Sequence, residues 1–410
     1  MAGQWIDIKA ADGGTFKGYL AIPASGSGPA ILLLHDIFGV APSMRIADYY
    51  AEEGYVVLVP DLFWRMDPRV DLGCAEADFS KAMQYSLRFD ADLSVKDCTD
   101  ALQSLRARPE TIGKVGALGF GLGGKIAYLV TVHTDVDCAV SYYGIGIEAY
   151  LSEASKIKRP IVFHYAELDP LAPAEARTQT RSAFANRPDV EFYFYPGCNH
   201  AFAAPERASF NRPASLMAHS RSIALFRKAL GPHYDLSSLW DKHTELEFAT
   251  RSAEATMGTM VAEPYVNHIP IMTGGVGHSD LLRFYKNHFI PKTPKDTKLI
   301  PISRTIGSDR VVDEMLFCFT HDTEIDWMLP GIFPTGRYVE IPLVAIVCFR
   351  GDKLYNEHIY WDQASVLVQI GLLDPNKLPV AGIETAKKLV DESLPSNARM
   401  ARWAESAPKI

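Results

Sequence analysis

Two polar residues in the first half of the chain have the types and the order of a catalytic acid and base. Asp169 follows the strand-like segment 160–165. His200 follows the next strand-like segment, 191–195. A carboxylate can orient an imidazole and stabilise its protonated form, and the imidazole can take a proton from a nucleophile. Because both residues come after a glycine-rich turn, in the order of a hydrolytic triad, we expect them to act as a pair.

The glycine-rich turn at residues 115–125 is where the nucleophile of such a triad should stand. Its sequence, VGALGFGLGGK, predicts a strand, a sharp turn and the start of a helix. This is the layout of a nucleophile elbow, G-x-Nuc-x-G, with Gly119 and Gly123 as the flanking glycines. The central position is Gly121, which has no side chain. A covalent intermediate at this position is therefore excluded for the chain as written.

Gly121 leaves three interpretations open. The glycine can be an engineered replacement of the nucleophile that traps a substrate. It can also be natural, with His200 and Asp169 retained as a base that acts on water or on a substrate C–H or O–H group. In the third interpretation the domain is a scaffold that binds without catalysis. Cys198 lies two residues before His200 and could supply a thiol, but we expect its side chain to point away.

Further residues that follow strand-like segments complete the expected site. In a site of this type, the N–H groups of Ile37 and Leu122 are the expected oxyanion donors. Asp36 would point a carboxylate into the site, or would cap a turn. The expected pocket residues are aromatic, although the two tyrosines could equally belong to the core: Phe38, Tyr142, Tyr143 and Phe202.

Alternating strand-like and helix-like segments form the framework that must position these residues. Short apolar runs bounded by Gly, Ser or Pro predict strands at 18–22, 30–34, 55–59, 115–118, 139–143, 160–165 and 191–195. Helical spacing predicts helices at 44–54, 92–107 and 215–230. Strands separated by helices form a mostly parallel sheet that is covered on both faces. We therefore expect a doubly wound α/β domain at residues 1–231.

Residues 10–230 resemble the dienelactone hydrolase (carboxymethylenebutenolidase) family, which has the α/β-hydrolase fold. The resemblance lies in HDIFG at 35–39, PDL at 60–62, the elbow, YYG at 142–144, Asp169, Pro173 and NHAF at 199–202. The family carries Cys where this chain has Gly121, and usually Glu, which holds and activates the thiol, where it has Asp36. The resemblance implies a hydrolase of a small lactone, ester or related carbonyl compound. A proton-transferring isomerase, cyclase or lyase is one alternative, and a catalytically dead binding or scaffold protein is another.

A second domain follows a change of composition at Gly231-Pro232. We expect a linker at 232–238 and helices at 239–260 and 280–289. Strand-like runs follow, with turn sequences between neighbours that predict hairpins, at 297–306, 310–321, 339–350 and 353–361. Helices followed by antiparallel strands describe an α+β domain, which we expect at 239–385, with a helical tail at 386–410.

The segment 239–373 resembles the SnoaL-like polyketide cyclases, a branch of the NTF2-like fold in which a curved sheet and helices enclose a cone-shaped pocket. The resemblance lies in the leading helix, PYVNH at 264–268, GGVG at 274–277, PTGR at 334–337 and EHIYWD at 357–362. This fold hosts enzymes and pure binding modules alike. Since such sheets commonly pair, the resemblance also implies a homodimer through the C-terminal domain.

The last strand-like run carries the candidate polar residues of this second pocket. Alternation places His358, Tyr360 and Asp362 on one face, which we expect to line the pocket and to do acid–base work. Asp362 is the nearest match to the pocket aspartate of the cyclases, but it could instead cap a following helix. His268 and His321 are further pocket candidates, each of which could be merely structural.

Bulk composition limits the class of protein and its partners. A chain of 410 residues suggests two or three domains, and 48% hydrophobic and 22% charged residues are typical of a globular protein. A net charge of −8 argues against nucleic acid or an anionic membrane as a partner, so we expect a small-molecule substrate. The first residues do not form a signal peptide, and no apolar run reaches the roughly 20 residues of a membrane span.

The cysteines and histidines predict neither a disulfide framework nor a metal centre. The six cysteines have no C-x-x-C spacing, which predicts reduced thiols and a cytoplasmic protein. We noted no H-x-x-x-H spacing and no pairing of histidines with carboxylates, so no metal is expected. The sequence likewise indicates no cofactor.

Overall fold

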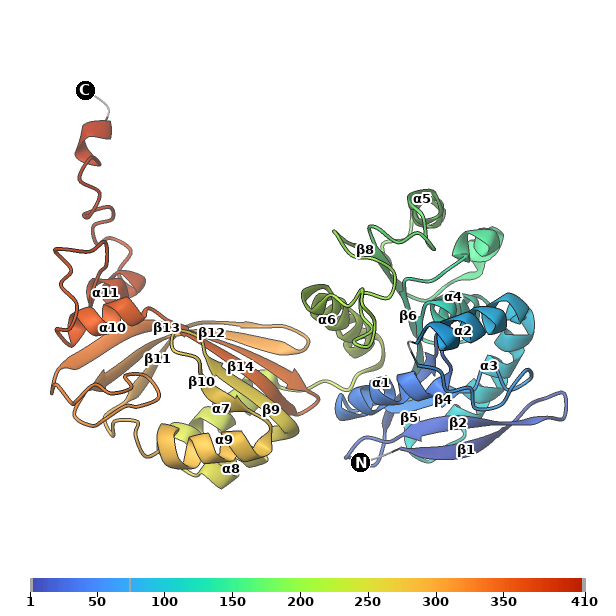
Figure 1. Cartoon of the computed structure of the whole chain (residues 1–410), viewed down its shortest axis with the longest axis horizontal. Helices are drawn as coiled ribbons and strands as arrows, with labels where there is room; N and C mark the ends of the chain where they lie inside the picture. Colours follow the sequence, from blue (N-terminus) through green and yellow to red (C-terminus); the bar gives the residue numbers. More distant parts are fainter. Residues whose placement is uncertain (1–2, 74, 408–410) are drawn as a thin grey trace. The chain divides into compact units, whose positions relative to one another are not determined.

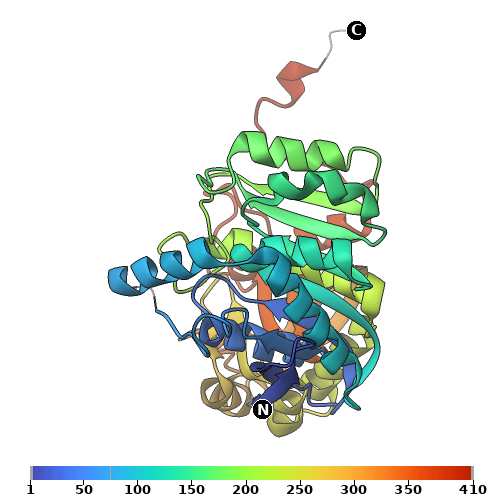
Figure 2. The same cartoon turned by 90° about the vertical axis from the view of Figure 1, so that its right-hand side faces the viewer.

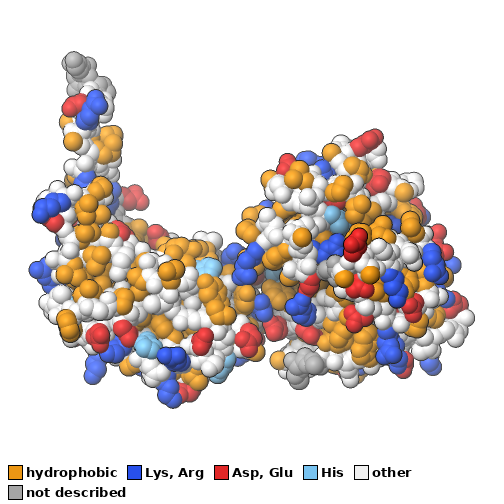
Figure 3. All heavy atoms as spheres, viewed as in Figure 1, with side chains coloured by type: hydrophobic (Ala, Val, Ile, Leu, Met, Phe, Trp, Pro, Cys, Tyr) orange, Lys and Arg blue, Asp and Glu red, His pale blue; other side chains and the backbone are white. Residues whose placement is uncertain are grey.

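The computed structural model describes residues 3–73 and 75–407, so that Cys74, one of the six cysteines, lies outside the described residues. The chain divides into two compact units, Met1–His233 and Tyr234–Ile410, each built around its own sheet (Figure 1). Within the described residues, no helix combines the length and the apolar character that crossing a bilayer requires. Basic and acidic side chains are interspersed with apolar ones over the face shown in Figure 3.

An eight-stranded sheet forms the centre of the first unit. Its strands are β1 (Gln4–Lys9), β2 (Thr15–Ala21), β3 (Gly28–Leu34), β4 (Val56–Pro60), β5 (Thr111–Phe120), β6 (Cys138–Tyr142), β7 (Ile161–Ala166) and β8 (Val190–Tyr195). They lie in the order β1-β2-β4-β3-β5-β6-β7-β8. β2 is antiparallel to both of its neighbours, and the strands from β4 to β8 are parallel to one another. The mostly parallel sheet predicted from the sequence is thus confirmed.

Helices cover both faces of this sheet, as Figures 1 and 2 show. They are α1 (Val40–Glu52), α2 (Glu76–Arg88), α3 (Ala91–Arg106), α4 (Leu122–His133), the 3-10 helix η1 (Ile147–Lys156), α5 (Ala174–Ala183) and α6 (Arg212–Leu230). One core includes Leu102 of α3 and Ile126 of α4, and another includes Tyr50 of α1 and Phe226 of α6. Because both faces are covered, β3 can be apolar and buried at every position.

A six-stranded sheet forms the second unit. Its strands are β9 (Met260–His268), β10 (Thr273–Val276), β11 (Lys298–Ile306), β12 (Arg310–Thr320), β13 (Tyr338–Arg350) and β14 (Lys353–Trp361). They lie in the order β10-β9-β14-β13-β12-β11, and all neighbours are antiparallel except β14 and β9, which are parallel. The last four strands agree with the predicted ones. β9 and β10 were not predicted as strands.

The helical part of the second unit departs from the prediction. It contains α7 (Leu236–Thr244), the π-helix η2 (Glu245–Ala249), α8 (Ala253–Gly258), α9 (His278–Phe284), the π-helix η3 (Tyr285–Phe289), α10 (Gln363–Gln369), α11 (Glu384–Val390) and the 3-10 helix η4 (Ala404–Ser406). The single helix predicted for 239–260 is wrong. Arg251 has a φ of 57°, which ends the first helix, and Ser252 accepts a hydrogen bond as the N-cap of α8. α7 also begins inside the expected linker.

One face of the second sheet packs against these helices. The largest core of this unit includes Trp240 of α7, Met257 of α8 and Phe284 of α9, packed against Phe317 of β12. A smaller cluster places Ala386 of α11 with side chains of β12 on the opposite face. The polar residues on the helix-covered face are therefore enclosed among aromatic side chains.

Gly123 marks the closest approach of α4 to β3, and its replacement tests how far the first unit depends on that approach. A Cβ at this position would lie 2.0 Å from the carbonyl oxygen of Leu34. We expect Gly123→Ala to lower the free energy of unfolding by about 1–3 kcal/mol, measured by urea denaturation, because the backbones must separate. Gly258→Ala is the control, since a Cβ there meets nothing within 4 Å. Equal effects of both variants would contradict the prediction.

Candidate functional site

The glycine-rich turn forms a sharp elbow between β5 and α4. Gly121 has φ 55° and ψ −113°, a conformation that residues with a side chain rarely adopt. Its N–H donates to the carbonyl of Tyr142 on β6, with an N–O distance of 3.0 Å, and α4 begins at the next residue. The elbow lies at the carboxyl end of the parallel strands, where α/β sheets bind ligands. The predicted strand, turn and helix are confirmed.

The carboxylate of Asp36 fills the space in which a nucleophile's side chain would begin. A Cβ built on Gly121 would lie 2.4 Å from Asp36 Oδ1, closer than two unbonded heavy atoms can approach. The same oxygen accepts hydrogen bonds from the N–H of Ile37 (2.8 Å) and, at 3.3 Å, from that of Leu122. The two expected oxyanion donors thus converge on one carboxylate oxygen, as the donors of an oxyanion hole must.

His35 holds the backbone that carries Asp36. Its Nδ1–H donates to the Asp36 carbonyl at 2.7 Å, and its Nε2 accepts from the N–H of Leu62 at 3.0 Å. Burial lowers the pKa of His35 and favours the neutral ring, which has one donor and one acceptor for these two bonds. His35 is therefore a positioning residue, a role that its place in the HDIFG motif did not reveal.

Asp169 and His200 are in contact, as the order of the motifs predicted. Asp169 Oδ2 lies 2.8 Å from His200 Nδ1. Asp169 is buried, and its other oxygen accepts from the N–H groups of Leu171 (2.9 Å) and Ala172 (3.3 Å). The His200 side chain keeps 15% of its surface exposed. With Nδ1–H bound to the carboxylate, Nε2 is the ring atom that can accept a proton.

Tyr143 connects this pair to the Asp36 carboxylate. Its ring packs edge-on against His200, with centroids 5.0 Å apart, and against Phe202 at 5.6 Å. Burial raises the pKa of Tyr143, and the nearby charge of Asp36 raises it further. Tyr143 therefore packs directly against His200, and Phe202 lies behind it, but both side chains are buried and belong to the same core as Tyr142.

The other two expected pocket residues have different surroundings. Tyr142 directs its hydroxyl to Ser222 Oγ at 2.8 Å and is part of the core, which is the alternative that the sequence left open. Phe38 packs under the guanidinium of Arg207, whose carbon lies 4.6 Å from the ring centroid. The charge of Arg207 also acts on Tyr143 and opposes the rise of its pKa. Arg207 was missed because an isolated arginine in a loop carries no sequence signal.

Cys198 does not replace the missing nucleophile. Its side chain is buried, and burial raises the pKa of the thiol, so the reactive thiolate is disfavoured. All five cysteines within the described residues are free thiols, in agreement with the prediction of reduced cysteines: Cys98, Cys138, Cys198, Cys318 and Cys348.

The parallel sheet, the elbow at the carboxyl ends of its strands and the acid–base pair define an α/β-hydrolase. The profile of the dienelactone hydrolase family matches residues 16–230. The carboxymethylenebutenolidase of Pseudomonas putida is 32% identical over 226 residues, which are 54% of this chain and 95% of the relative. Carboxymethylenebutenolidase 1 of Cupriavidus pinatubonensis is 30% identical over 234 residues, 57% of this chain and 100% of the relative. The chain belongs to the dienelactone hydrolase family and is a hydrolase of that type.

These similarities concern the first unit. Among solved structures, that of a dienelactone hydrolase-like promiscuous phosphotriesterase from metagenomic libraries is 21% identical, with a TM-score of 0.49 over 56% of this chain and 100% of that chain. The family profile ends at residue 230, before the second unit begins.

In the second unit, the expected polar face of β14 is turned away from the helices. The predicted alternation is present, but Glu357 and Ile359 are buried on the covered face. His358 is half-buried and Tyr360 is exposed on the other face. The prediction that these two residues line the pocket is wrong. Alternation fixes which residues share a face of the strand but not which face is covered. In β14 the face with Ile359 and Trp361 packs against the core.

Asp362 and the two candidate histidines also have distinct roles. Asp362 is exposed and caps α10, where its side chain accepts a hydrogen bond from the N–H of Ala364 at 3.0 Å. The prediction that Asp362 is a pocket residue is therefore wrong, and the alternative that it caps a helix is correct. His268 does line the cavity under the sheet. His321 is buried elsewhere, with its Nδ1 3.2 Å from the hydroxyl of Thr335.

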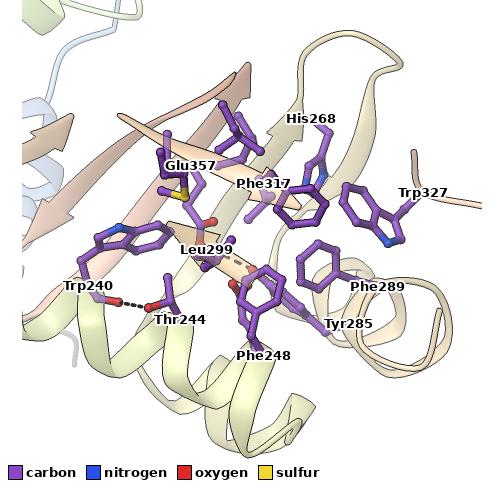
Figure 4. A pocket seen from close by; sticks show the side chains of 16 residues that line it. Trp240, Thr244, Phe248, His268, Tyr285, Phe289, Leu299, Phe317, Trp327 and Glu357 are labelled. Atoms are coloured by element: carbon purple, nitrogen blue, oxygen red, sulfur yellow. Dashed lines mark hydrogen bonds between the residues drawn. The ribbon is translucent and has the colours of Figure 1, made fainter. Parts of the chain in front are cut away.

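A cavity of about 40 Å³ lies between the inner face of this sheet and the helices (Figure 4). Its walls are mostly apolar, with aromatic and aliphatic side chains, and its few polar side chains include Glu247 and Glu357. Both carboxylates face the imidazole of His243. Burial lowers the pKa of His243, but the charges of the two glutamates outweigh it and raise the pKa to about 10. The sequence analysis overlooked this group, although His243 and Glu247 are four residues apart and so share a helix face.

A double-mutant cycle tests whether Asp36 and position 121 compete for one space. Gly121→Ala should lower the free energy of unfolding in the otherwise unchanged chain, because the new Cβ clashes with Asp36 Oδ1. In the Asp36→Ala background the same substitution should cost less, with a coupling of about 0.5–3 kcal/mol, measured by chemical denaturation of all four proteins. Strictly additive effects would show that the two positions do not share this space.

Proposed function

We propose that the first unit hydrolyses a small lactone, ester or related carbonyl compound by direct attack of a water molecule that His200 activates. The observation that carries this proposal is the convergence of the Ile37 and Leu122 N–H groups on one anionic oxygen. That arrangement stands beside a histidine whose Nδ1 is bound to a buried carboxylate. Together they supply an oxyanion site and a general base, without a nucleophilic side chain.

In the proposed reaction, the carbonyl oxygen of the substrate takes the position of Asp36 Oδ1 between the two N–H groups. His200 Nε2 removes a proton from water, and the water oxygen forms a bond to the carbonyl carbon. Asp169 stabilises the imidazolium that results. When the tetrahedral intermediate collapses, the C–O bond to the alkoxide breaks, and the imidazolium returns its proton to that oxygen. Once the Asp36 carboxylate has moved away, the absence of a side chain at Gly121 leaves room for the attacking water, where a nucleophile would otherwise stand.

The neighbouring side chains favour a flat substrate with a negative substituent. The aromatic ring of Tyr143 packs against His200 and Phe202, and Phe38 packs with Ile37 and Leu122, which carry the two N–H groups. Arg207 supplies a positive charge beside the ring of Phe38. Since Asp36 must leave the N–H groups when the substrate binds, a cation near the pocket would compensate part of the negative charge there.

His200→Ala tests the proposed general base. With p-nitrophenyl acetate or a simple aryl lactone as substrate, we expect kcat/KM to fall by about 10²–10⁴, because loss of a positioned base has an effect of this size. His133→Ala is a control, since His133 lies at the surface end of α4 and pairs only loosely with Glu153. Absence of turnover by the unchanged chain, or full activity of His200→Ala, would contradict the proposed mechanism.

We also propose that the second unit is an NTF2-like cone of the SnoaL type and that it pairs two chains into a homodimer. Support comes from the helices packed on one face of a mostly antiparallel sheet and from the enclosed aromatic cavity. Ile300 and Ile306 are exposed on β11, an edge strand that could meet a second copy. Light scattering should give twice the 45.4 kDa of one chain. A monomeric mass at micromolar concentration would contradict the dimer.

A further inference from the structure

We propose that His243, Glu247 and Glu357 form a binding site for one divalent transition-metal ion in the second unit. The three side chains come from α7, η2 and β14. Their ligand atoms, His243 Nε2 and one carboxylate oxygen from each glutamate, all lie within 4.8 Å of one another. This inference is independent of the hydrolysis proposed for the first unit, because none of these residues belongs to that unit.

The separations of the ligand atoms suit a shared ion. His243 Nε2 lies 3.2 Å from Glu247 Oε1 and 3.1 Å from Glu357 Oε1. An ion held at about 2.1 Å from each ligand separates its ligands by about 3.0 Å at octahedral angles and by about 3.4 Å at tetrahedral angles. Charged imidazole–carboxylate hydrogen bonds are usually shorter, at about 2.7–2.9 Å. The two separations from His243 Nε2 fall in the range for a shared ion, and the two carboxylate oxygens lie within 4.8 Å of each other.

Thr259 fixes which ring nitrogen of His243 faces the carboxylates. The Thr259 hydroxyl donates to the carbonyl of Thr256 at 2.7 Å, so its oxygen must accept in its second short contact. That contact is to His243 Nδ1, at 2.6 Å. Nδ1 therefore carries a proton, and a metal ion bound to Nε2 would take the place of the second proton of the imidazolium. Metal-binding histidines are commonly oriented in this way by an acceptor bound to their other ring nitrogen.

The buried group holds two carboxylates, and the His243 imidazolium supplies at most one positive charge to balance them. His243, Glu247 and Glu357 are 0%, 5% and 3% exposed. Within the described part of the chain, the only ion pairs of the two carboxylates are those with His243, so that two potential negative charges face one imidazole. Tyr285 adds only a neutral hydroxyl, 3.5 Å from Glu357 Oε1. Because buried charges are paired or coordinate metals, a divalent cation fits this charge balance.

The adjoining cavity provides space for the remaining ligands of the ion. Both glutamates line this cavity of about 40 Å³, which has room for about three water molecules. His268 lines the same cavity (Figure 4) and donates its Nδ1–H to the carbonyl of Thr273 at 3.1 Å. Burial lowers the pKa of His268 to about 4, which leaves its Nε2 as an acceptor for a metal-bound water. The geometry thus describes three protein ligands beside a cavity that could hold metal-bound water.

The ligand types limit the choice of metal. Two carboxylate oxygens and one imidazole nitrogen, without a thiolate, suit Mn²⁺, Fe²⁺, Co²⁺ or Zn²⁺. A hard ion such as Ca²⁺ would need more oxygen ligands than this group and its small cavity supply. We therefore select Mn²⁺, Co²⁺ and Zn²⁺ as probes that remain stable in air.

The test uses the full chain after treatment with a chelator. Titration with Mn²⁺, followed by electron paramagnetic resonance, and with Co²⁺ or Zn²⁺, followed by calorimetry, should show one ion bound per chain. Glu247→Gln and Glu357→Gln should abolish this binding while circular dichroism stays unchanged. Thr259→Val should weaken it by about 10–100-fold, since it removes the acceptor that orients His243.

Two control variants and one structural measurement keep the proposal falsifiable. His288→Ala removes another His–carboxylate pair of this unit, that of His288 with Asp326, and should leave binding unchanged. His200→Ala should also leave it unchanged, because that residue lies in the first unit. If Glu357→Gln fails to fold, two other results test the proposal: loss of metal binding by Glu247→Gln, and an anomalous difference peak between the three side chains in Zn²⁺-soaked crystals. Failure to bind any of the three ions, or equal binding by Glu247→Gln, would overturn the proposal.

Discussion

The first unit is organised around the carboxylate of Asp36 and the two N–H groups that hold it. Asp36 and Leu122 are 86 residues apart in the sequence, so their contact requires β3 and β5 to lie side by side with their ends aligned. The Leu122 N–H belongs to the first turn of α4, where free backbone donors and the helix dipole favour an anion. An N–H group left unpaired there would cost free energy, and Asp36 satisfies two such groups at once.

This interaction changes the meaning of the glycine at the elbow. Compared with the dienelactone hydrolase family, this chain differs at two positions: Gly121 lacks the thiol, and Asp36 is a shorter acid than the usual Glu. In the structure they are one arrangement, because the carboxylate of Asp36 occupies the volume that a side chain at 121 would need. The glycine at 121 and the position of the Asp36 carboxylate do not affect the acid–base pair, because Asp169 is held by backbone N–H groups of its own loop and binds His200. The proposed hydrolysis by water activation therefore requires only that the Asp36 carboxylate move off the Ile37 and Leu122 N–H groups when the substrate binds.

Local patterns in the sequence predicted the first unit well and the second unit less well. The alternation of strands and helices predicted the parallel sheet, and motifs at strand ends predicted the contact of Asp169 with His200; both are local signals. The convergence of two N–H groups on Asp36 depends on how two distant loops meet, which no local pattern reports. The alternation of side chains along β14 was predicted correctly, but alternation alone does not tell which face of the sheet the helices cover. The break at Arg251 was hidden because apolar spacing continues on both sides of it.

The histidine–carboxylate groups at His200 and at His243 differ in the ring nitrogen that meets the carboxylate. In His200 it is Nδ1, and the second oxygen of Asp169 is already bonded to backbone N–H groups, so Nε2 remains available at a partly exposed pocket. In His243 it is Nε2, because Nδ1 is bound to Thr259, and two carboxylates converge on one atom in a closed space. The first arrangement can accept a proton from solvent, whereas the second concentrates ligand atoms. Orientation and burial, rather than residue type, thus separate a proton-transfer site from a cation site.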